Sequence, residues 1–414
     1  MANTYWINGN KYSNCISLVK TEPMRHKVFL TLIALVCALN IVPSNAALSP
    51  SAIPAIFDKL LDVPALSNPA MILIDGTTGE IVYQRKANSQ RKPASVMKLL
   101  AGVSTLKYLD PESIFSTDIS IGTESQTLVI QGSYDPWISV SHIAARKMNR
   151  ESLPYLANSS MAMLRKANAN SLEEITVFYS DLFSQDVSNF KSYWAKVGFK
   201  PTMKAVSRAE SFAKAGTMAV SDTSPKLSEI LKFTLLWSDN LLAERLARLA
   251  SRAAGYGFNI EGVAQTFAQV LTDLEIDPTK LRVLDASGLS KQNRVTASMV
   301  GQLLFKLRQD EKYKYIYDSL PIGGISGTLE SRFLTTTPTA IGLVRAKTGT
   351  LNGTVTLAGY VESVDREYVF VTLADDIQRG TRASDKARAA IDRILGRIAA
   401  PNIPTEISEV EPTP

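Results

Sequence analysis

Segments typical of β-strands lie near both ends of the chain, and a long, mainly helical stretch separates them. Residues 70–85, AMILIDGTTGEIVYQR, hold two β-rich runs around an Asp-Gly-Thr-Thr-Gly turn, which predicts a hairpin. Residues 342–376 hold three runs with turns at Asn352-Gly353 and Asp365-Arg366, which predicts an antiparallel meander. We therefore expect an α+β fold in which hairpin and meander form one antiparallel sheet, backed by the N- and C-terminal helices and flanked by a helical lobe.

The middle of the chain divides into two parts. Residues 224–255 are strongly helical with an interruption near Ser238, and amphipathic helices follow at 261–276 and 296–310. Upstream, helical stretches rich in Ala, Ser, Asn and Lys surround the run EEITVFYSDLF, which predicts an inserted subdomain. The expected organisation is a leader at 1–46, a main domain in two parts at 47–136 and 218–400, the insertion at 137–217, and a disordered acidic tail at 401–414.

The leader has the layout of a secretory signal peptide. From Met24, a basic segment at 25–27 precedes an uncharged apolar run at 28–42, and Ser44-Asn45-Ala46 offers small residues for cleavage before Ala47. The apolar run is short for a membrane span, and an uncleaved anchor is the alternative. We therefore expect export to the periplasm or to the extracellular cell-wall space, with residues 1–23 upstream of the true start.

Composition without the leader excludes several kinds of chemistry. Both cysteines, Cys15 and Cys37, lie in the leader, so the exported chain has no disulfide and no thiolate nucleophile. His142 is the one histidine left, which disfavours histidine-rich metal sites and a Ser-His-Asp triad. The net charge falls from +6 to about +3, which is too weak a bias to indicate nucleic acid. We expect no metal and no cofactor.

A serine nucleophile with a lysine base is one reading of the stretch RKPASVMKLL. The pattern S-x-x-K alone carries little information, because the chain holds six copies of it, at Ser17, Ser89, Ser95, Ser104, Ser188 and Ser211. Ser95 differs in following a predicted strand, with Pro93 suited to a first helical turn and an apolar helix behind. Lys98 then lies one turn along, within reach of the hydroxyl, where it can act as a neutral base if its pKa is lowered. A plain helix start is the alternative.

Two further motifs occur once each. Ser238-Asp239-Asn240 interrupts a helix, and this loop could present Ser238 as a proton relay and Asn240 as an amide partner for a substrate carbonyl. Lys347-Thr348-Gly349 ends a strand, where Lys347 and Thr348 could hold a substrate carboxylate and Gly349 could let a peptide approach. The Thr350 amide would pair with that of Ser95 as an oxyanion hole. Taken singly, these motifs also fit a polar break between helices and an ordinary strand end.

The order S-x-x-K, S-x-N, K-T-G resembles that of the penicilloyl-serine transferases. Five flanking stretches resemble D-Ala-D-Ala carboxypeptidase/endopeptidases of the penicillin-binding protein 4 type, peptidase family S13: PASVMKLL, SPKLSEILKFTLLWSDNLLAERLAR, LDASGLSKQNRVT, LPIGGISGTLESRF and VRAKTGTLNGTVTLAGYV. The resemblance covers residues 70–135 and 218–398. It implies a β-lactamase/transpeptidase-like fold with an inserted subdomain, and peptidoglycan stem peptides as substrates.

The resemblance also implies a mechanism. Ser95 attacks the D-Ala-D-Ala peptide bond, Lys98 takes its proton, and Ser238, with Lys347 nearby, passes a proton to the leaving amine. Asn240 orients the acyl part, Lys347 and Thr348 hold the terminal carboxylate, and Lys347 lowers the pKa of Lys98 further. β-Lactam antibiotics would be covalent inhibitors on Ser95. The balance between trimming and cross-link cleavage, the diamino acid preference and the oligomeric state stay open.

The chain departs from the family pattern in places that bear on substrate recognition by the insertion and leave the core chemistry intact, and two alternative functions are weighed beside the carboxypeptidase. The interval between Ser95 and Ser238 is shorter than in well-known members, the stretch QGSYDP replaces a Gly-rich GGGDP, and TLADD replaces a segment that usually ends in Asn. One alternative is a serine β-lactamase, although no E-x-x-L-N pattern lies between Ser95 and Ser238. The other is a catalytically weak cell-wall or β-lactam binding module. D-Ala release that is lost in Ser95→Ala would separate an enzyme from such a module.

Overall fold

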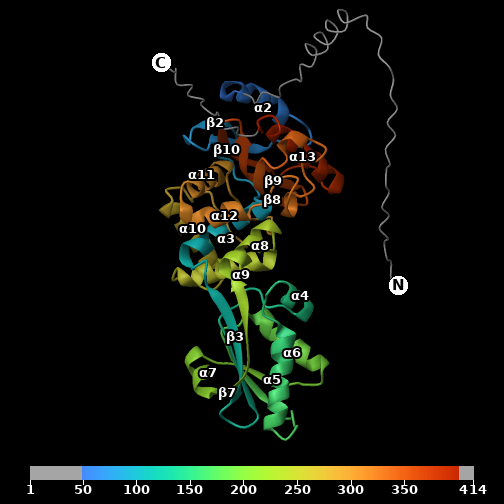
Figure 1. The fold of residues 1–414 in the computed structure, drawn as a ribbon. Helices are drawn as coiled ribbons and strands as arrows, with labels where there is room; N and C mark the ends of the chain where they lie inside the picture. The colour runs from blue at the N-terminus through green and yellow to red at the C-terminus, as the bar shows by residue number, and fades with distance from the viewer. Residues whose placement is uncertain (1–48, 401–414) are drawn as a thin grey trace, which may run out of the picture. The chain divides into compact units, whose positions relative to one another are not determined.

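The computed structural model describes residues 49–400 (Figure 1). The predicted signal peptide and the predicted disordered tail at 401–414 lie outside these residues. Within 49–400, no helix combines the length and the apolar character that crossing a bilayer requires.

The first sheet joins the two ends of the described chain. Its strand order is β2-β1-β10-β9-β8, and every neighbouring pair is antiparallel. The strands are β1 (Ala70–Asp75), β2 (Ile81–Arg85), β8 (Val344–Leu351), β9 (Thr354–Ser363) and β10 (Arg366–Ala374). The predicted hairpin and meander are confirmed, because β1 and β2 pair with each other and β10 pairs with β1 in the same sheet. Strand β8, which carries Lys347, forms one edge.

Both faces of this sheet are buried. On one face, alternate β1 residues such as Met71 and Leu73 share a buried cluster with residues of the N-terminal and C-terminal helices α2 (Ile53–Leu61) and α13 (Thr381–Leu395). Figure 1 shows both helices beside this sheet. On the other face, Ile72 and Ile74 join the core of the helical lobe. Successive side chains of a strand point to opposite faces, so one short apolar strand contributes to two cores.

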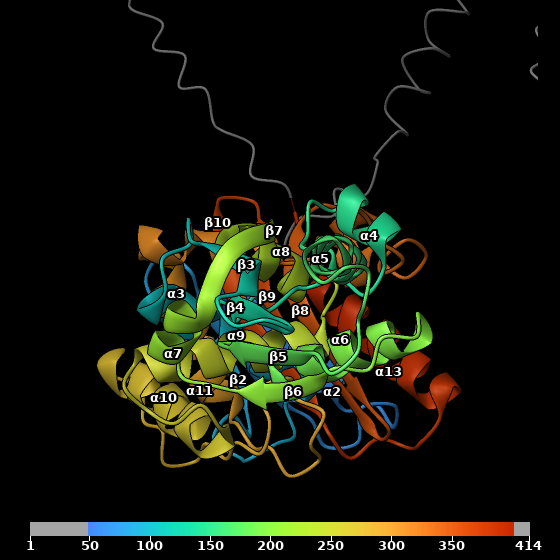
Figure 2. The same ribbon diagram turned by 90° about the horizontal axis from the view of Figure 1, so that it is seen from below.

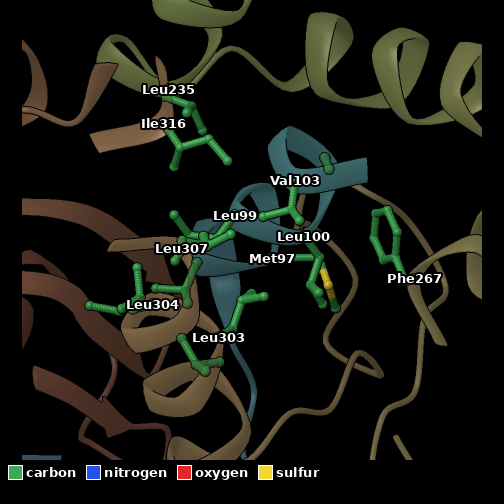
Figure 3. Close-up of a cluster of buried hydrophobic side chains, with 14 of the residues drawn as sticks. Met97, Leu99, Leu100, Val103, Leu235, Phe267, Leu303, Leu304, Leu307 and Ile316 are labelled. Atoms are coloured by element: carbon green, nitrogen blue, oxygen red, sulfur yellow. The ribbon is translucent and has the colours of Figure 1, made fainter. Parts of the chain in front are cut away.

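The helical lobe is built around α3. It contains α3 (Lys98–Tyr108), α8 (Leu227–Leu236), α9 (Asn240–Ala253), α10 (Ile260–Asp273), α11 (Ala297–Arg308) and α12 (Lys314–Ser319). Residues 98–106 of α3 are all buried, and Figure 3 shows Leu99, Leu100 and Val103 surrounded by side chains of neighbouring helices. Because α3 is buried on all sides along this stretch, the lobe holds it in place, and this fixes the position of the turn just before it. Short 3-10 turns lie at Pro50–Ala52, Ala94–Met97, Glu311–Tyr313, Gly327–Leu329 and Pro338–Ala340.

A second sheet has its own core. Its strand order is β6-β5-β4-β3-β7; β3 pairs antiparallel with β4 and β7, and β5 pairs parallel with β4 and β6 (Figure 2). Its strands are β3 (Ile114–Gly122), β4 (Thr127–Gly132), β5 (Thr176–Ser180), β6 (Thr202–Ala205) and β7 (Ala215–Lys226). Its helices are α4 (His142–Lys147), α5 (Leu153–Ala167), α6 (Ser184–Lys196) and α7 (Arg208–Lys214). Phe190 and Trp194 of α6 are fully buried against this sheet.

The second sheet includes strands on both sides of the boundaries expected at 136/137 and 217/218. Strands β3 and β4 precede the expected insertion, and β7 runs past its end. A strand-forming run reads the same in sequence whichever sheet it joins, and this is why local pattern placed β3 and β4 in the main domain. We propose that the insertion extends over about residues 113–226 in place of 137–217.

Candidate active site

The segment before Ser95 is held in place by residues of β9 and of the end of β10, which lie more than 250 residues later in the sequence. The carboxylate of Asp375, just after β10, accepts hydrogen bonds from Arg91 Nη1 and from the Lys92 amide, both at 3.0 Å. Thr356 Oγ1 of β9 donates to the Pro93 carbonyl at 2.9 Å. Asp375 belongs to the TLADD stretch that departs from the family pattern, and it anchors the chain that leads to Ser95.

Two glycines allow other segments to come close to Ser95. A Cβ on Gly349 would collide with Thr356 Oγ1 and crowd the Pro93 carbonyl at 2.9 Å. A Cβ on Gly288 would collide with the Ala94 carbonyl, and Gly288 has a φ of +88°, a conformation suited to glycine. The sequence predicted that Gly349 makes room for a substrate. In the structure the immediate reason for glycine there is the packing of β8 on the chain that precedes Ser95.

Lys98 binds three separate segments of the chain. It is fully buried, and its Nζ donates to Ser95 Oγ at 2.9 Å, to Asn240 Oδ1 at 2.7 Å and to the Ser287 carbonyl at 2.6 Å. An ammonium group has three N–H bonds, and each of them has an acceptor here. Ser95 lies in the 3-10 turn Ala94–Met97 and Lys98 begins α3, so the predicted one-turn spacing brings the two side chains together.

Burial and nearby carboxylates oppose each other at Lys98. Burial lowers the pKa of Lys98 to about 8, against the raising effect of Asp285, Asp239 and Glu244. Lys347 is also fully buried and donates to the Thr348 carbonyl at 3.1 Å. Its pKa is lowered well below the usual range, first by burial and then by the charge of Lys98. The two amines repel each other, and Lys347 has no carboxylate among the causes of its pKa shift to offset this repulsion.

The S-D-N loop lies between two helices, as its sequence predicted. Ser238 has a positive φ of 61° between α8 and α9, and Asp239 caps α9 by accepting from the Leu242 amide at 2.9 Å. Asn240 is the first residue of α9 and is exposed, with its Oδ1 on Lys98. The loop thus aims Asn240 at the lysine, an arrangement that the sequence did not predict.

A cleft of about 360 Å³ opens in front of these groups. Five of the predicted site residues line it: Ser95, Ser238, Thr348, Gly349 and Thr350. The rest of the lining is Thr328, Ser331, Arg332, Val355, Thr356 and Arg388. Lys98 and Lys347 are buried beside it. The eight residues predicted from three distant motifs therefore gather around one cleft.

The sequence analysis did not identify the residues that hold Lys98 in place, and it did not identify Arg388, an arginine that lines the cleft. Ser287 takes part through its backbone carbonyl, which every residue has, so no residue type could reveal it. Glu244 accepts from the amides of Ala286 and Ser287, and it lies four residues after Asn240 on α9. Arg388 comes from α13, far from all three motifs, and donates to Thr350 Oγ1 at 3.1 Å.

A serine hydroxyl bonded to a buried lysine, at the edge of an antiparallel sheet and beside an S-D-N loop, defines a serine acyl-transfer enzyme of the transpeptidase fold. The chain belongs to the D-Ala-D-Ala carboxypeptidase 3 (S13) family, whose model matches residues 54–154 and 166–398. It is a serine-type D-Ala-D-Ala carboxypeptidase. Family membership thus favours the carboxypeptidase over the β-lactamase and weak-binding alternatives.

Relatives cover most of the chain. It is 27% identical over 380 residues to the carboxypeptidase DacB of Mycolicibacterium smegmatis, spanning 80% of this chain and 83% of that one. It is 25% identical over 427 residues to the D-alanyl-D-alanine carboxypeptidase of Actinomadura sp., spanning 76% and 79%. The crystal structure of penicillin-binding protein 4 from Haemophilus influenzae has the same fold, with a TM-score of 0.64 at 16% identity over 82% of this chain and 97% of that one.

Acylation is expected to depend on pH through Lys98. A base must lose its proton to accept another, so the rate constant for acylation by a fluorescent penicillin should rise with pH around a midpoint of about 8. The measurement is that second-order rate constant between about pH 5.5 and 9.5. A midpoint more than about two units away would rule out Lys98 as the group that titrates.

Proposed function

We propose that the enzyme cleaves D-Ala-D-Ala-type bonds in peptidoglycan stem peptides through an acyl-enzyme on Ser95, with Lys98 as the general base. The observation that carries this assignment is the 2.9 Å contact between Lys98 Nζ and Ser95 Oγ at the wall of the cleft. The β-lactam complexes solved for relatives, including a penicillin G-acylated endopeptidase of Bdellovibrio bacteriovorus, support β-lactams as covalent inhibitors.

In acylation, an ester bond to Ser95 replaces the peptide bond, and protons move from Ser95 and to the leaving amine. Ser95 Oγ forms a bond to the carbonyl carbon of the penultimate D-Ala, and its proton passes to neutral Lys98. The C–N bond to the terminal residue then breaks, and the proton held by Lys98 passes through Ser238 to the leaving amine, which leaves Lys98 neutral again. Water attacks the ester, which releases the acyl part as a carboxylic acid and returns the proton to Ser95 Oγ. Over the whole cycle, one peptide bond is hydrolysed by one water molecule, and the products are a carboxylic acid and an amine.

Backbone amides and Asn240 complete the acyl side of the site. The Ser95 and Thr350 amides form the oxyanion hole in this proposal. It is supported by the close approach of β8 to the segment before Ser95, which Gly349 permits. Because Asn240 Oδ1 accepts from Lys98, its Nδ2 group is the part that orients the acyl carbonyl. Asn240 thus has two tasks, one toward the base and one toward the substrate.

Arg388 supplies the charge that binds the terminal carboxylate. Lys347 is fully buried with a lowered pKa, which makes it a poor source of positive charge, whereas Thr348 lines the cleft and can donate a hydrogen bond. Arg332 is held by both carboxylate oxygens of Asp392 at 3.0 and 2.9 Å. Arg388 pairs with Asp385, whose side chain is 59% exposed, and such a surface pair is weak enough for a substrate carboxylate to compete.

Substrates with and without a terminal carboxylate test Arg388. A charge-assisted hydrogen bond contributes about 1.5–3 kcal/mol, so Arg388→Gln should lower kcat/KM for an acyl-D-Ala-D-Ala peptide by about 10- to 100-fold. Cleavage of the matching C-terminal amide should change little. Arg393→Gln, an exposed arginine on the same helix, is the control and should leave both substrates unaffected. Equal loss on acid and amide would show that Arg388 does not bind the carboxylate.

Penicillin labelling tests the nucleophile. Labelled penicillin should attach to Ser95 alone, and Ser95→Ala should abolish both the label and D-Ala release from a pentapeptide. The matched control is Ser104→Ala, because Ser104 is a buried serine of another S-x-x-K copy and its Oγ has no hydrogen-bond partner. That variant should keep the label. An adduct on any other residue, mapped by mass spectrometry, would contradict the assignment.

We propose that the enzyme hydrolyses the peptide cross-links of peptidoglycan as well as releasing terminal D-Ala. Predatory endopeptidases of Bdellovibrio bacteriovorus share the fold, with a TM-score of 0.55 at 16% identity. A cleft of about 360 Å³ that is open to solvent can admit a leaving group larger than D-Ala. Purified protein should therefore cleave cross-linked muropeptide dimers as well as pentapeptides, measured by chromatography of the products. Dimers that survive while pentapeptides are trimmed would limit the enzyme to carboxypeptidase activity.

We propose that the enzyme is exported to where this substrate lies. The signal peptide predicted from Met24 supports export to the periplasm or cell-wall space, where peptidoglycan is found. The fold of the described residues needs neither metal nor cofactor in this mechanism, since Ser95 and Lys98 supply the nucleophile and the base.

A further inference from the structure

The carbonyl that binds Lys98 belongs to a loop in which the amides of residues 286–290 all donate to carboxylates. We call residues 284–290, Leu-Asp-Ala-Ser-Gly-Leu-Ser, the 284–290 loop. Asp285 Oδ1 accepts from Ser287 Oγ at 3.2 Å, from the Gly288 amide at 2.5 Å and from the Leu289 amide at 3.1 Å. The peptide between Ser287 and Gly288 therefore donates its N–H to Asp285 and accepts from Lys98 at its oxygen. Hydrogen bonds arranged in a chain strengthen one another.

Glu244 fixes the same loop from α9. Its Oε1 accepts from the Ala286 amide at 2.8 Å and from the Ser287 amide at 2.9 Å. Asn240 lies one turn before Glu244 on the same helix, and its Oδ1 binds Lys98 directly at 2.7 Å. Residues four apart lie on the same face of a helix. One face of α9 therefore contacts Lys98 directly through Asn240 and indirectly through Glu244 and the 284–290 loop.

We infer that Glu244 is a positioning residue for the base: it orients the Ser287 carbonyl on Lys98 and adds negative charge beside the ammonium. This role rests on the proposed function of Lys98, and Glu244 itself is not among the residues that line the cleft. The geometric part follows from the two amide bonds, because without them the amides of Ala286 and Ser287 lose their partner and the loop its anchor on α9.

The charge part concerns every group that faces Lys98. Asp285 from the loop and Asp239 and Glu244 from the S-D-N segment and α9 raise the pKa of Lys98, whereas Lys347 on β8 repels it. Removing the charge of Glu244 should therefore lower the pKa of Lys98 and move the acylation profile to lower pH. Arg248 Nη1 lies 3.6 Å from Glu244 Oε2, one turn further along α9, so an ordinary surface ion pair is the competing explanation for this carboxylate.

Three variants separate geometry, charge and ion pairing. Glu244→Gln keeps an oxygen that can accept both amides but removes the charge, so it should retain the maximal acylation rate and shift the midpoint to lower pH. Glu244→Ala removes both the accepting oxygen and the charge. It should shift the midpoint to lower pH and also lower the maximal acylation rate by up to about 100-fold, as expected when a reacting group is displaced by about 1 Å. Arg248→Gln removes only the ion pair and should not lower the midpoint.

The measurement is the pH profile of acylation by a fluorescent penicillin, with circular dichroism as the check on folding. A Glu244→Gln profile identical to that of the wild type would overturn the charge role. A Glu244→Ala maximal rate equal to that of the wild type would overturn the positioning role, and so would Arg248→Gln reproducing the effects of Glu244→Ala. If Glu244→Ala does not fold, Glu244→Gln still decides the charge role. A wild-type protein that penicillin does not acylate would instead refute the proposed function.

Discussion

A buried ammonium group must find an acceptor for each of its N–H bonds, and this requirement on Lys98 organises the site. Its partners come from the turn before α3, from the first residue of α9 and from the backbone of the 284–290 loop. An uncompensated charge in a protein interior is costly, so no one of these segments can move away without penalty. The glycines at 288 and 349 meet the same need, because they let the loop and β8 approach the segment that carries Ser95.

The two buried lysines differ in their surroundings more than in their burial. Lys98 is faced by three carboxylates, and Lys347 by none that offset its loss of water. Their environments therefore push the two pKa values apart, a pattern found where two titratable groups of one site have different tasks. A guanidinium stays protonated at any physiological pH, which is why the proposed function assigns the substrate carboxylate to Arg388.

The parts of the fold that sequence predicted are those with local signals. Alternation and turn residues located the hairpin and the meander, and the i to i+3 spacing put Lys98 beside Ser95. The extent of the insertion had no such signal, because β3 and β4 look alike as strands of either sheet. The Ser287 carbonyl was hidden for another reason: a backbone acceptor has no residue type. Glu244 and Arg388 gain meaning only when long-range packing brings α9 to the loop and α13 to β8.

Helix α9 connects the insertion to the site. Asn240 and Glu244 face Lys98 and its loop, while the next residue, Arg245, points to the insertion, where it donates to Asp186 Oδ1 at 2.9 Å and to the Pro136 carbonyl at 3.1 Å. Both members of this ion pair are buried, with side chains only 4% and 3% exposed. A buried pair of this kind is a weak source of net stability but specifies one geometry, since breaking it leaves an unpaired charge. The helix that aims two groups at the base is therefore held in rotation and in translation by the insertion.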